Sequence, residues 1–214
     1  MLTAAATNNF HGFQLTKVAE AQFPTQYGLF RVFGFEGRCG DAAEEALALK
    51  MGDLGATASA KAPLVRIHSQ CLTGEVFGSL RCDCGQQLQL ALAMIAEAGA
   101  GVVIYEEQEG RGIGLIPKLQ AYELQDLGCD TVEANQRLGF KTDYRDFVLP
   151  VEILKQLGVG RLRLLSNNPD KLEALQRAGL QVVERVPCEG KPNPHVAPYL
   201  KTKKQKLHQL LTCL

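Results

Sequence analysis

The spacing of hydrophobic residues changes along the chain from a strand-like to a helix-like period. Residues 13–35 alternate apolar and polar positions, with a proline and a glycine midway, which predicts two early strands or a hairpin. Residues 64–68, LVRIH, predict another strand. Over residues 86–99, leucines and Ile95 recur at helical spacing, and Gly99 is expected to end that helix.

Strands and helices alternate over the rest of the chain. Residues 101–105, GVVIY, form a continuous apolar run of the kind found in buried parallel strands. A glycine-rich turn and a helix over residues 115–128 are expected to follow. Further helices are expected at residues 151–158 and 170–179, and further strands at residues 161–166 and 181–186. This alternation predicts an α/β fold in which a mixed sheet is flanked by helices.

Length and composition are those of an ordinary globular chain. The 214 residues suit one domain at residues 15–200, between a flexible leader at 1–14 and a basic tail at 201–214 that favours a helix or a solvated face. The contents of 46% hydrophobic and 21% charged residues exclude wholesale disorder. Zero net charge argues against nucleic-acid and membrane partners, and no apolar run approaches the roughly 18 residues of a membrane span.

Three of the seven cysteines form one cluster, Cys71, Cys82 and Cys84. The first residues lack the basic flank and apolar stretch of a secretory signal, so we expect a reducing cytoplasm, where clustered cysteines indicate metal binding or catalysis. Three thiolates would leave the fourth position of a zinc ion open for water, as in catalytic zinc sites. His68 is either a fourth ligand or a hydrogen-bond partner beside the cluster, and Arg81 is expected to offset the thiolate charge.

Two further segments carry charged residues in patterns that suit a ligand. Residues 108–114, QEGRGIG, lie between a strand and a helix, where backbone N–H groups favour anions and Arg111 offers a planar fork to phosphate. A plain tight turn explains these glycines equally well. Residues 143–147, DYRDF, place an arginine between two aspartates, which by composition alone indicates a surface ion-pair cluster.

Four segments in unbroken order resemble the GTP cyclohydrolase II family. They are RIHSQCLTGEVFGSLRCDCGQQL, YEEQEGRGIGL, AYELQDLGCDTVEANQRLGF and TDYRDF, and the similarity extends from about residue 15 into the tail. The resemblance implies zinc-dependent hydrolysis of GTP, the first committed step of riboflavin biosynthesis. The guanine imidazole ring would open with release of formate and pyrophosphate, giving 2,5-diamino-6-(5-phosphoribosylamino)pyrimidin-4(3H)-one. It also implies a cytoplasmic homodimer with one Zn²⁺ per subunit and Mg²⁺ on the triphosphate.

The resemblance assigns roles to individual residues of this chain. The three clustered cysteines would hold the zinc, Asp143 would accept a proton, and Tyr122 would act in ring opening. Arg145 would be the nucleophile toward the α-phosphate, or, because a pKa near 13 keeps arginine protonated, would stabilise charge while water attacks. Glu109 would read the guanine N1–H and amine as a pair. The GTP contacts would be Arg66, Ile67, His68, Ser69, Gln70, Gln87, Glu109, Gly110, Arg111, Thr131, Ser166 and Lys171.

The chain departs from the family pattern at three places. Gln70 stands where a glutamate is common, Ser166 stands where threonine is usual, and Glu106 and Glu107 stand where a basic pair is frequent. The two glutamates would repel a triphosphate if they faced it. All residues expected to bind zinc or to react are retained, so we expect an active enzyme.

Three alternatives to the full reaction remain open from the sequence. A relative that stops after one hydrolysis is disfavoured by Tyr122. A zinc-stabilised GTP-binding protein without turnover would keep the cysteines but should have changed at Asp143, Tyr122 or Arg145. A zinc-bearing nucleic-acid binder is disfavoured by the zero net charge and the absence of a fourth ligand near the cluster.

Overall fold

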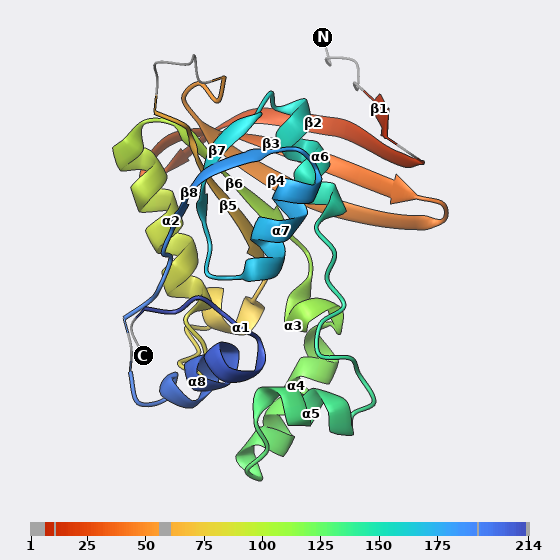
Figure 1. The fold of residues 1–214 in the computed structure, drawn as a ribbon, viewed down its shortest axis with the longest axis vertical. Helices are drawn as coiled ribbons and strands as arrows, with labels where there is room; N and C mark the ends of the chain where they lie inside the picture. The colour runs from red at the N-terminus through yellow and green to blue at the C-terminus, as the bar shows by residue number, and fades with distance from the viewer. Residues whose placement is uncertain (1–6, 11, 56–60, 192, 213–214) are drawn as a thin grey trace.

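The structure is a computed structural model that describes residues 7–10, 12–55, 61–191 and 193–212 (Figure 1). Eight strands of these residues form one sheet in the order β1-β2-β3-β4-β6-β5-β7-β8. The strands are β1 (Thr7–Phe10), β2 (Phe13–Thr25), β3 (Gly28–Cys39), β4 (Ala42–Met51), β5 (Leu64–Ser69), β6 (Gly101–Glu106), β7 (Arg161–Leu165) and β8 (Gln181–Val186). The helices are α1 (Leu72–Glu75), α2 (Cys84–Ala98), α3 (Glu109–Gly112), α4 (Leu115–Asp126), α5 (Thr131–Arg137), α6 (Val148–Gln156), α7 (Pro169–Arg177) and α8 (Ala197–Lys206).

The sheet is antiparallel on one side and parallel on the other. Strands β1 to β4 pair as antiparallel neighbours, and β4 also runs antiparallel to β6. Strands β6, β5, β7 and β8 are parallel neighbours. The prediction of an α/β fold with a mixed sheet is therefore confirmed, and the apolar run at residues 101–105 is the buried parallel strand β6.

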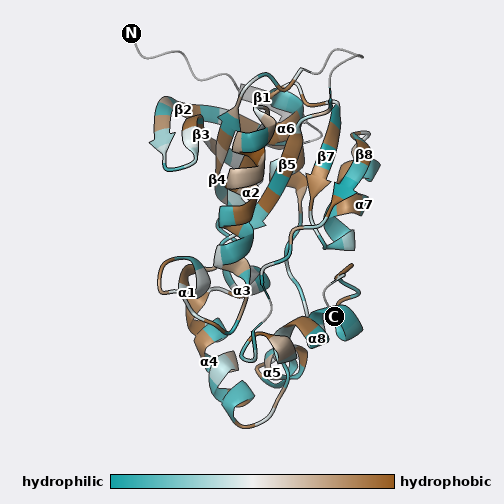
Figure 2. Cartoon of the chain, turned by 90° about the vertical axis from the view of Figure 1, so that its left-hand side faces the viewer, coloured by the Kyte–Doolittle hydropathy of each residue, from teal (hydrophilic) through white to brown (hydrophobic). Residues whose placement is uncertain are grey.

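Helices cover both faces of the sheet. Successive side chains of each central strand point to opposite faces, so both faces are apolar and each needs a covering layer. On one face, Val102 and Ile104 of β6 pack in a cluster with residues of α6 and α7. On the other face, Val103 packs with Ala91 and Ile95 of α2. In Figure 2 hydrophobic residues alternate with hydrophilic ones along β5 and β7, whereas much of α7 is hydrophilic.

The remaining helices gather at one end of the sheet. In Figure 1, α1, α3, α4, α5 and α8 lie beyond the ends of β5 and β6 that lead into α1 and α3. These are the carboxyl ends of two adjacent parallel strands, and open α/β sheets bind their ligands in the crevice outside such ends. The fold therefore places the segments that follow β5 and β6 at the position of a ligand site.

The chain ends differ from the predicted boundaries. Residues 7–10 and 13–14 of the predicted leader belong to β1 and β2, and residues 1–6 and 11 lie outside the described residues. Helix α8 begins at Ala197, before the predicted tail, and ends at Lys206. None of the described helices is both long enough and apolar enough to cross a membrane.

Candidate active site

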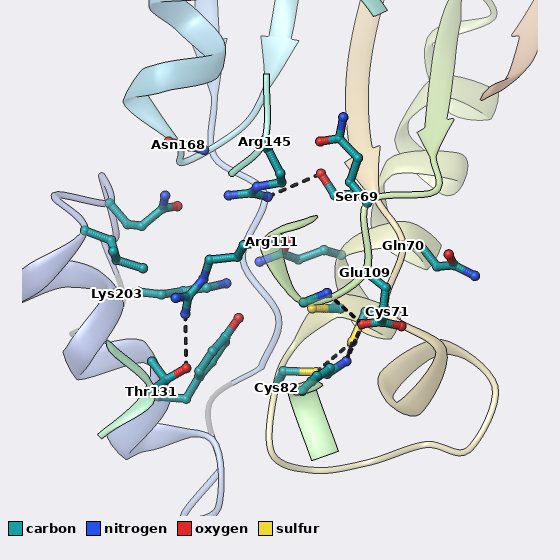
Figure 3. A pocket seen from close by; sticks show the side chains of 18 of the residues that line it. Ser69, Gln70, Cys71, Cys82, Glu109, Arg111, Thr131, Arg145, Asn168 and Lys203 are labelled. Atoms are coloured by element: carbon teal, nitrogen blue, oxygen red, sulfur yellow. Dashed lines mark hydrogen bonds and ion pairs between the residues drawn. The ribbon is translucent and has the colours of Figure 1, made fainter. Parts of the chain in front are cut away.

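One cavity lies at the carboxyl ends of β5 and β6, among the helices that gather there. In Figure 3 the thiols of Cys71 and Cys82 lie on one side of this cavity and Lys203 lies on the other. Of the described residues that line it, seven are lysine or arginine and one, Glu109, is a carboxylate. The basic residues are Arg66, Arg81, Arg111, Lys118, Arg145, Lys171 and Lys203. A concave site with this excess of positive charge attracts a polyanion.

Most residues predicted for the site line this cavity. They include the three clustered cysteines, Tyr122 and Arg145. The predicted GTP contacts among them are Arg66, His68, Ser69, Gln70, Gln87, Glu109, Gly110, Arg111, Thr131, Ser166 and Lys171. Two predicted residues do not line it: Ile67 is fully buried in the hydrophobic core, and Asp143 is ion-paired with Arg145.

Of the clustered cysteines, Cys71 lies between β5 and α1, Cys82 lies in the loop after α1, and Cys84 begins α2. The Sγ atoms of Cys71, Cys82 and Cys84 all lie within 4.8 Å of one another, and none is in a disulfide. Hydrogen bonds from the other two thiols, assisted by the charge of Lys118, lower the pKa of Cys71. The hydrogen bond to Cys71 raises the pKa of Cys82 to about 11. A metal ion would therefore displace protons from two of the thiols.

The chain around the thiols fits a zinc ion. Gly74 packs so closely that a Cβ atom there would lie 2.8 Å from the Sγ of Cys82 and 3.3 Å from that of Cys71. Among the described residues, no fourth histidine, cysteine or carboxylate joins the group. Three thiolates with one position left for water form the donor set of a catalytic zinc site rather than of a closed structural one.

Lys118, and not Arg81, lies against the sulfur atoms. The Nζ of Lys118 donates to the Sγ of Cys71 at 3.1 Å and to Oε1 of Glu109 at 2.6 Å. Arg81 instead pairs with Asp126 at 2.6 Å. The contact expected of Arg81 is thus made by Lys118, because the guanidinium of Arg81 pairs with the exposed end of α4.

His68 is a hydrogen-bond partner beside the cluster. Its Nδ1 lies 3.3 Å from Nη2 of Arg66, which can only donate, so His68 accepts there and donates from Nε2 to Oε1 of Glu75 at 2.9 Å. Burial lowers the pKa of His68 to about 4, which keeps the ring neutral. The same Glu75 oxygen accepts from the backbone N–H of Cys71 at 2.8 Å, so His68 helps to fix the first cysteine. Both ring nitrogens are engaged, and neither is left for a metal.

The carboxylate of Glu109 is largely used within the protein. Oε1 accepts from Lys118 and from the backbone of Gly110 at 3.0 Å, and Oε2 accepts from the backbone of Leu72 at 2.7 Å. A carboxylate has about four accepting positions, so one remains on Oε2. Glu109 thus ties the turn after β6 to the segment after β5, and can accept one hydrogen bond from a ligand.

The glycine-rich segment after β6 is a tight turn that aims an arginine into the cavity. Gly110 and Arg111 both have left-handed backbone, with φ of 62° and 63°. Such a conformation costs a non-glycine residue about 1–2 kcal/mol, and strain of this kind is concentrated at functional sites. The guanidinium of Arg111 donates to Oγ1 of Thr131 at 3.1 Å and to the carbonyl of Thr142 at 3.2 Å, which fixes its position (Figure 3).

Arg145 is held by a two-point ion pair. Its Nε and Nη2 donate to the carboxylate of Asp143 at 3.0 and 2.6 Å, and its Nη1 donates to Oγ of Ser69 at 3.2 Å. Burial works against both charges, but the guanidinium lowers the pKa of Asp143 and the carboxylate raises the pKa of Arg145. The pair therefore rests as a carboxylate and a guanidinium, with the guanidinium at the cavity wall.

Lys171 and Tyr122 add an amine, which an anionic ligand would favour in its charged form, and a proton donor. The Nζ of Lys171 donates to the carbonyl of Ile67 at 2.9 Å, and burial, together with Arg145, lowers the pKa of Lys171 well below its ordinary value. An anionic ligand nearby would relieve this unfavourable burial. The hydroxyl of Tyr122 lies 3.2 Å from Oγ1 of Thr73, and burial raises the pKa of Tyr122, so it keeps its proton.

Helix α8 contributes residues that the sequence did not reveal. The Nζ of Lys203 lies 3.6 Å from Oδ1 of Asp83, which is buried between two of the clustered cysteines, and 4.4 Å from the ring centre of Tyr199. The other oxygen of Asp83 accepts from Gln87 at 2.6 Å, and Gln87 accepts from Arg66 at 2.7 Å. From the sequence, the lysines of the tail were expected either on a helix or on a face exposed to solvent. The packing of α8 instead places Lys203 at the active-site cavity.

Glu106 and Glu107 do not line the active-site cavity. Glu106 is 1% exposed, accepts from Oγ of Ser69 at 3.3 Å, and lies in a second cavity with Glu107. Neither glutamate lines the cavity in which the basic residues converge, although Glu106 shares Ser69 with Arg145 and Lys171.

Glu106 should make stability depend on pH. Burial raises its pKa from 4.5 to about 7, against the pull of Lys171 and Arg145. The folded state thus keeps this proton to higher pH than the unfolded state, so stability falls between about pH 4.5 and 7 and is level above that. Glu106→Gln should be more stable than the parent by roughly 3 kcal/mol at pH 8 and nearly equal to it near pH 4.5.

Urea unfolding at the two pH values, without added Mg²⁺ or Mn²⁺, measures this difference. Glu97→Gln, at an exposed position of α2, is the matched control, and its stability relative to the parent should be the same at both pH values. A gain in Glu106→Gln that is the same at both pH values would contradict the assigned titration.

Comparisons with known proteins agree with this geometry. The model of the GTP cyclohydrolase II family matches residues 16–187. GTP cyclohydrolase-2 of Yersinia pseudotuberculosis is 52% identical over 199 residues, which cover 93% of this chain and 99% of that protein. GTP cyclohydrolase-2 of Hahella chejuensis is 50% identical over 198 residues, covering 92% and 93% of the two chains.

A longer relative contains a region similar to this chain. The riboflavin biosynthesis protein RibBA of Chlorobium phaeovibrioides is 49% identical over 197 residues, which cover 92% of this chain and 47% of that protein. The family match spans most of the chain. The matched region contains the three clustered cysteines and six of the seven basic residues of the cavity, all but Lys203. The chain therefore belongs to the GTP cyclohydrolase II family.

Proposed function

We propose that this chain hydrolyses GTP to 2,5-diamino-6-(5-phosphoribosylamino)pyrimidin-4(3H)-one, formate and pyrophosphate, as an enzyme of riboflavin biosynthesis. The observation that carries the proposal is one cavity that combines three clustered thiols with seven basic side chains. The thiols suit a zinc ion and the basic residues suit a triphosphate. The names of the relatives, GTP cyclohydrolase-2 and a riboflavin biosynthesis protein, support GTP as the substrate and this place in metabolism.

The basic residues would bind and orient the triphosphate. Arg145 and Lys171 lie on either side of Ser69, whose Oγ is 3.2 Å from the first and 3.4 Å from the second. We place the α-phosphate against this pair, where charge that develops as pyrophosphate leaves would be stabilised. Arg111, held by Thr131, would contact the outer phosphates together with Mg²⁺.

The thiol side of the cavity would take the guanine. Zinc held by Cys71, Cys82 and Cys84 would supply a water activated for attack on carbon. Glu109 has one accepting position left, so it would take one hydrogen bond from the base and not the expected pair. Tyr122, whose hydroxyl keeps its proton, would donate that proton as the ring opens.

Arg145 would act by charge and not as a covalent nucleophile. Its guanidinium is already paired with the ionised Asp143 in the resting site. Asp143 would then be a positioning residue that holds the guanidinium in its fork geometry. Water would attack the α-phosphate in this scheme.

We further propose that the protein works in the cytoplasm as a homodimer, without nucleic-acid or membrane partners. The support is the family resemblance together with the zero net charge of the sequence.

The test is to incubate zinc-loaded protein with GTP and Mg²⁺ and to quantify pyrophosphate, formate and the diaminopyrimidine together. Equal amounts of all three are expected. Release of pyrophosphate without formate would support the proposed phosphate chemistry and contradict the proposed ring-opening step. If none of the three is formed while GTP still binds, the chain is a zinc-stabilised GTP-binding protein instead.

A further inference from the structure

A second cavity, of about 620 Å³, shares only Gln108 and Arg145 with the active-site cavity. Its walls come from β3, β4, the end of β6 and the segment that leads into α6. The other lining residues are Glu36, Arg38, Ala43, Glu44, Glu45, Glu106, Glu107, Gly112, Tyr144, Asp146 and Leu149.

The lining of this second cavity is strongly acidic, with six carboxylates and two guanidinium groups. Both guanidinium groups already have carboxylate partners, because Arg38 lies 3.8 Å from Glu36 and Arg145 lies 2.6 Å from Asp143. Within the described part of the chain, no lysine, arginine or histidine forms an ion pair with the carboxylates of β4, β6 or the segment before α6 that line the cavity. The cavity therefore has a deficit of positive charge.

The deepest of these carboxylates has an oxygen without a partner. Glu106 is 1% exposed, and its Oε2 accepts from Ser69, but its Oε1 has no hydrogen-bond partner. A buried polar atom left unpaired costs free energy, so native proteins rarely leave one without a ligand, a water or a proton.

Two further carboxylates come from other segments and face the same cavity. Glu44 lies on β4, two residues from Ala46, which pairs in register with Glu106. Burial and the charge of Asp146 both raise the pKa of Glu44, which shows that these two carboxylates are close enough to repel. Asp146 uses one oxygen to accept from the backbone of Val148 at 3.1 Å, and its other oxygen accepts no hydrogen bond from the described residues. Three chain segments thus bring like charges together around one space.

We propose that this second cavity binds one hydrated divalent cation of the Mg²⁺ class, with Glu106 and Glu44 as its main carboxylate contacts. Donors that are all carboxylate oxygens favour hard cations over zinc or copper. The three carboxylates do not form a group within 4.8 Å, which among the described residues only the cysteines do. Mg²⁺ suits this spacing because it keeps several waters and is bound through one or two carboxylates. The site does not depend on the proposed GTP hydrolysis.

Titration of zinc-loaded protein with Mn²⁺, without nucleotide, tests the site, with free Mn²⁺ measured by electron paramagnetic resonance. We expect one Mn²⁺ per chain, displaced by Mg²⁺. Glu44→Gln and Glu106→Gln should each weaken Mn²⁺ binding at least about tenfold, as loss of a carboxylate at a metal site does. Glu97→Gln, at an exposed position of α2, is the matched control and should bind Mn²⁺ like the parent.

Two outcomes would overturn the proposal. If no Mn²⁺ binds without nucleotide, Glu106 is held neutral by a proton alone. If Mn²⁺ binds but both variants bind it as tightly as the parent, the ion lies elsewhere. Zinc content equal to that of the parent shows that each variant has folded, and Glu44, on a partly exposed strand position, serves even if Glu106→Gln does not fold. Because no GTP is present, these results are independent of whether the protein hydrolyses it.

Discussion

Cys82→Ser is expected to abolish zinc binding and formate release together. Three thiols within 4.8 Å form the whole cluster among the described residues, so the variant keeps only two soft ligands. Zinc content should fall below roughly a tenth of that of the parent, and formate release should fall at least about a thousandfold, because no activated water is left for attack on carbon. Pyrophosphate release should continue, because Arg145 and Lys171 are contributed by other segments.

Cys39→Ser is the matched control for this substitution. Cys39 is a free, exposed cysteine at the end of β3, and its loss should change neither zinc content nor formate release. Metal analysis and formate and pyrophosphate assays on the same preparations separate the two steps. Formate release at the parental rate by zinc-free Cys82→Ser would contradict the assignment of the cluster to ring opening.

The central part of the fold could be predicted from the sequence because its signals are local. The continuous apolar run of β6 and the alternation in β2 and β3 each identify a strand without knowledge of the rest of the chain. Strand β4, AAEEALALKM, was not predicted, because alanine, glutamate and leucine favour helices. Its pairing with β3 and β6 on both sides overrides that preference.

Helix α5 was missed although the sequence contains its start signal. Asp130 and Glu133 form a capping box, in which the Asp130 carboxylate accepts from the backbone of Glu133 and the Glu133 carboxylate accepts from the backbone of Asp130. An acidic cap followed three residues later by glutamate is a recognisable helix start. This helix carries Thr131, which holds Arg111 at the cavity.

The site could be predicted as far as its residues lie in short motifs. One error could have been avoided: Arg66 and His68 reach the cavity, and since strand side chains alternate, Ile67 between them must point into the core. The contacts of Lys118 with Cys71 and of Lys203 with Asp83 could not be predicted. Each joins segments that are distant in sequence, so only the packing of α4 and α8 against the cluster determines it.

Arg145→Ala is expected to lower the rate of pyrophosphate release by at least about a thousandfold, the size of effect seen when an arginine that stabilises a phosphoryl transition state is removed. Arg145→Lys keeps the charge but loses the fork that pairs with Asp143, so it should retain a measurable fraction of the rate. Asp143→Asn leaves the guanidinium present but less firmly oriented, and should cost less than Arg145→Ala. Pyrophosphate release in single-turnover reactions is the measurement.

The covalent alternative requires Asp143 to take a proton from Arg145. At the ordinary pKa values of the two residues this transfer would cost about 12 kcal/mol, and in the folded protein the pKa of each is shifted in the direction that increases the cost. A reaction with a rate near 1 s⁻¹ has a total barrier of about 17 kcal/mol, so little would remain for the attack on phosphorus. We therefore expect mass spectrometry of Cys82→Ser reactions quenched with denaturant at alkaline pH, where an arginine–phosphorus bond survives, to detect no nucleotide attached to Arg145. An adduct on that residue would show that the guanidinium attacks despite its partner.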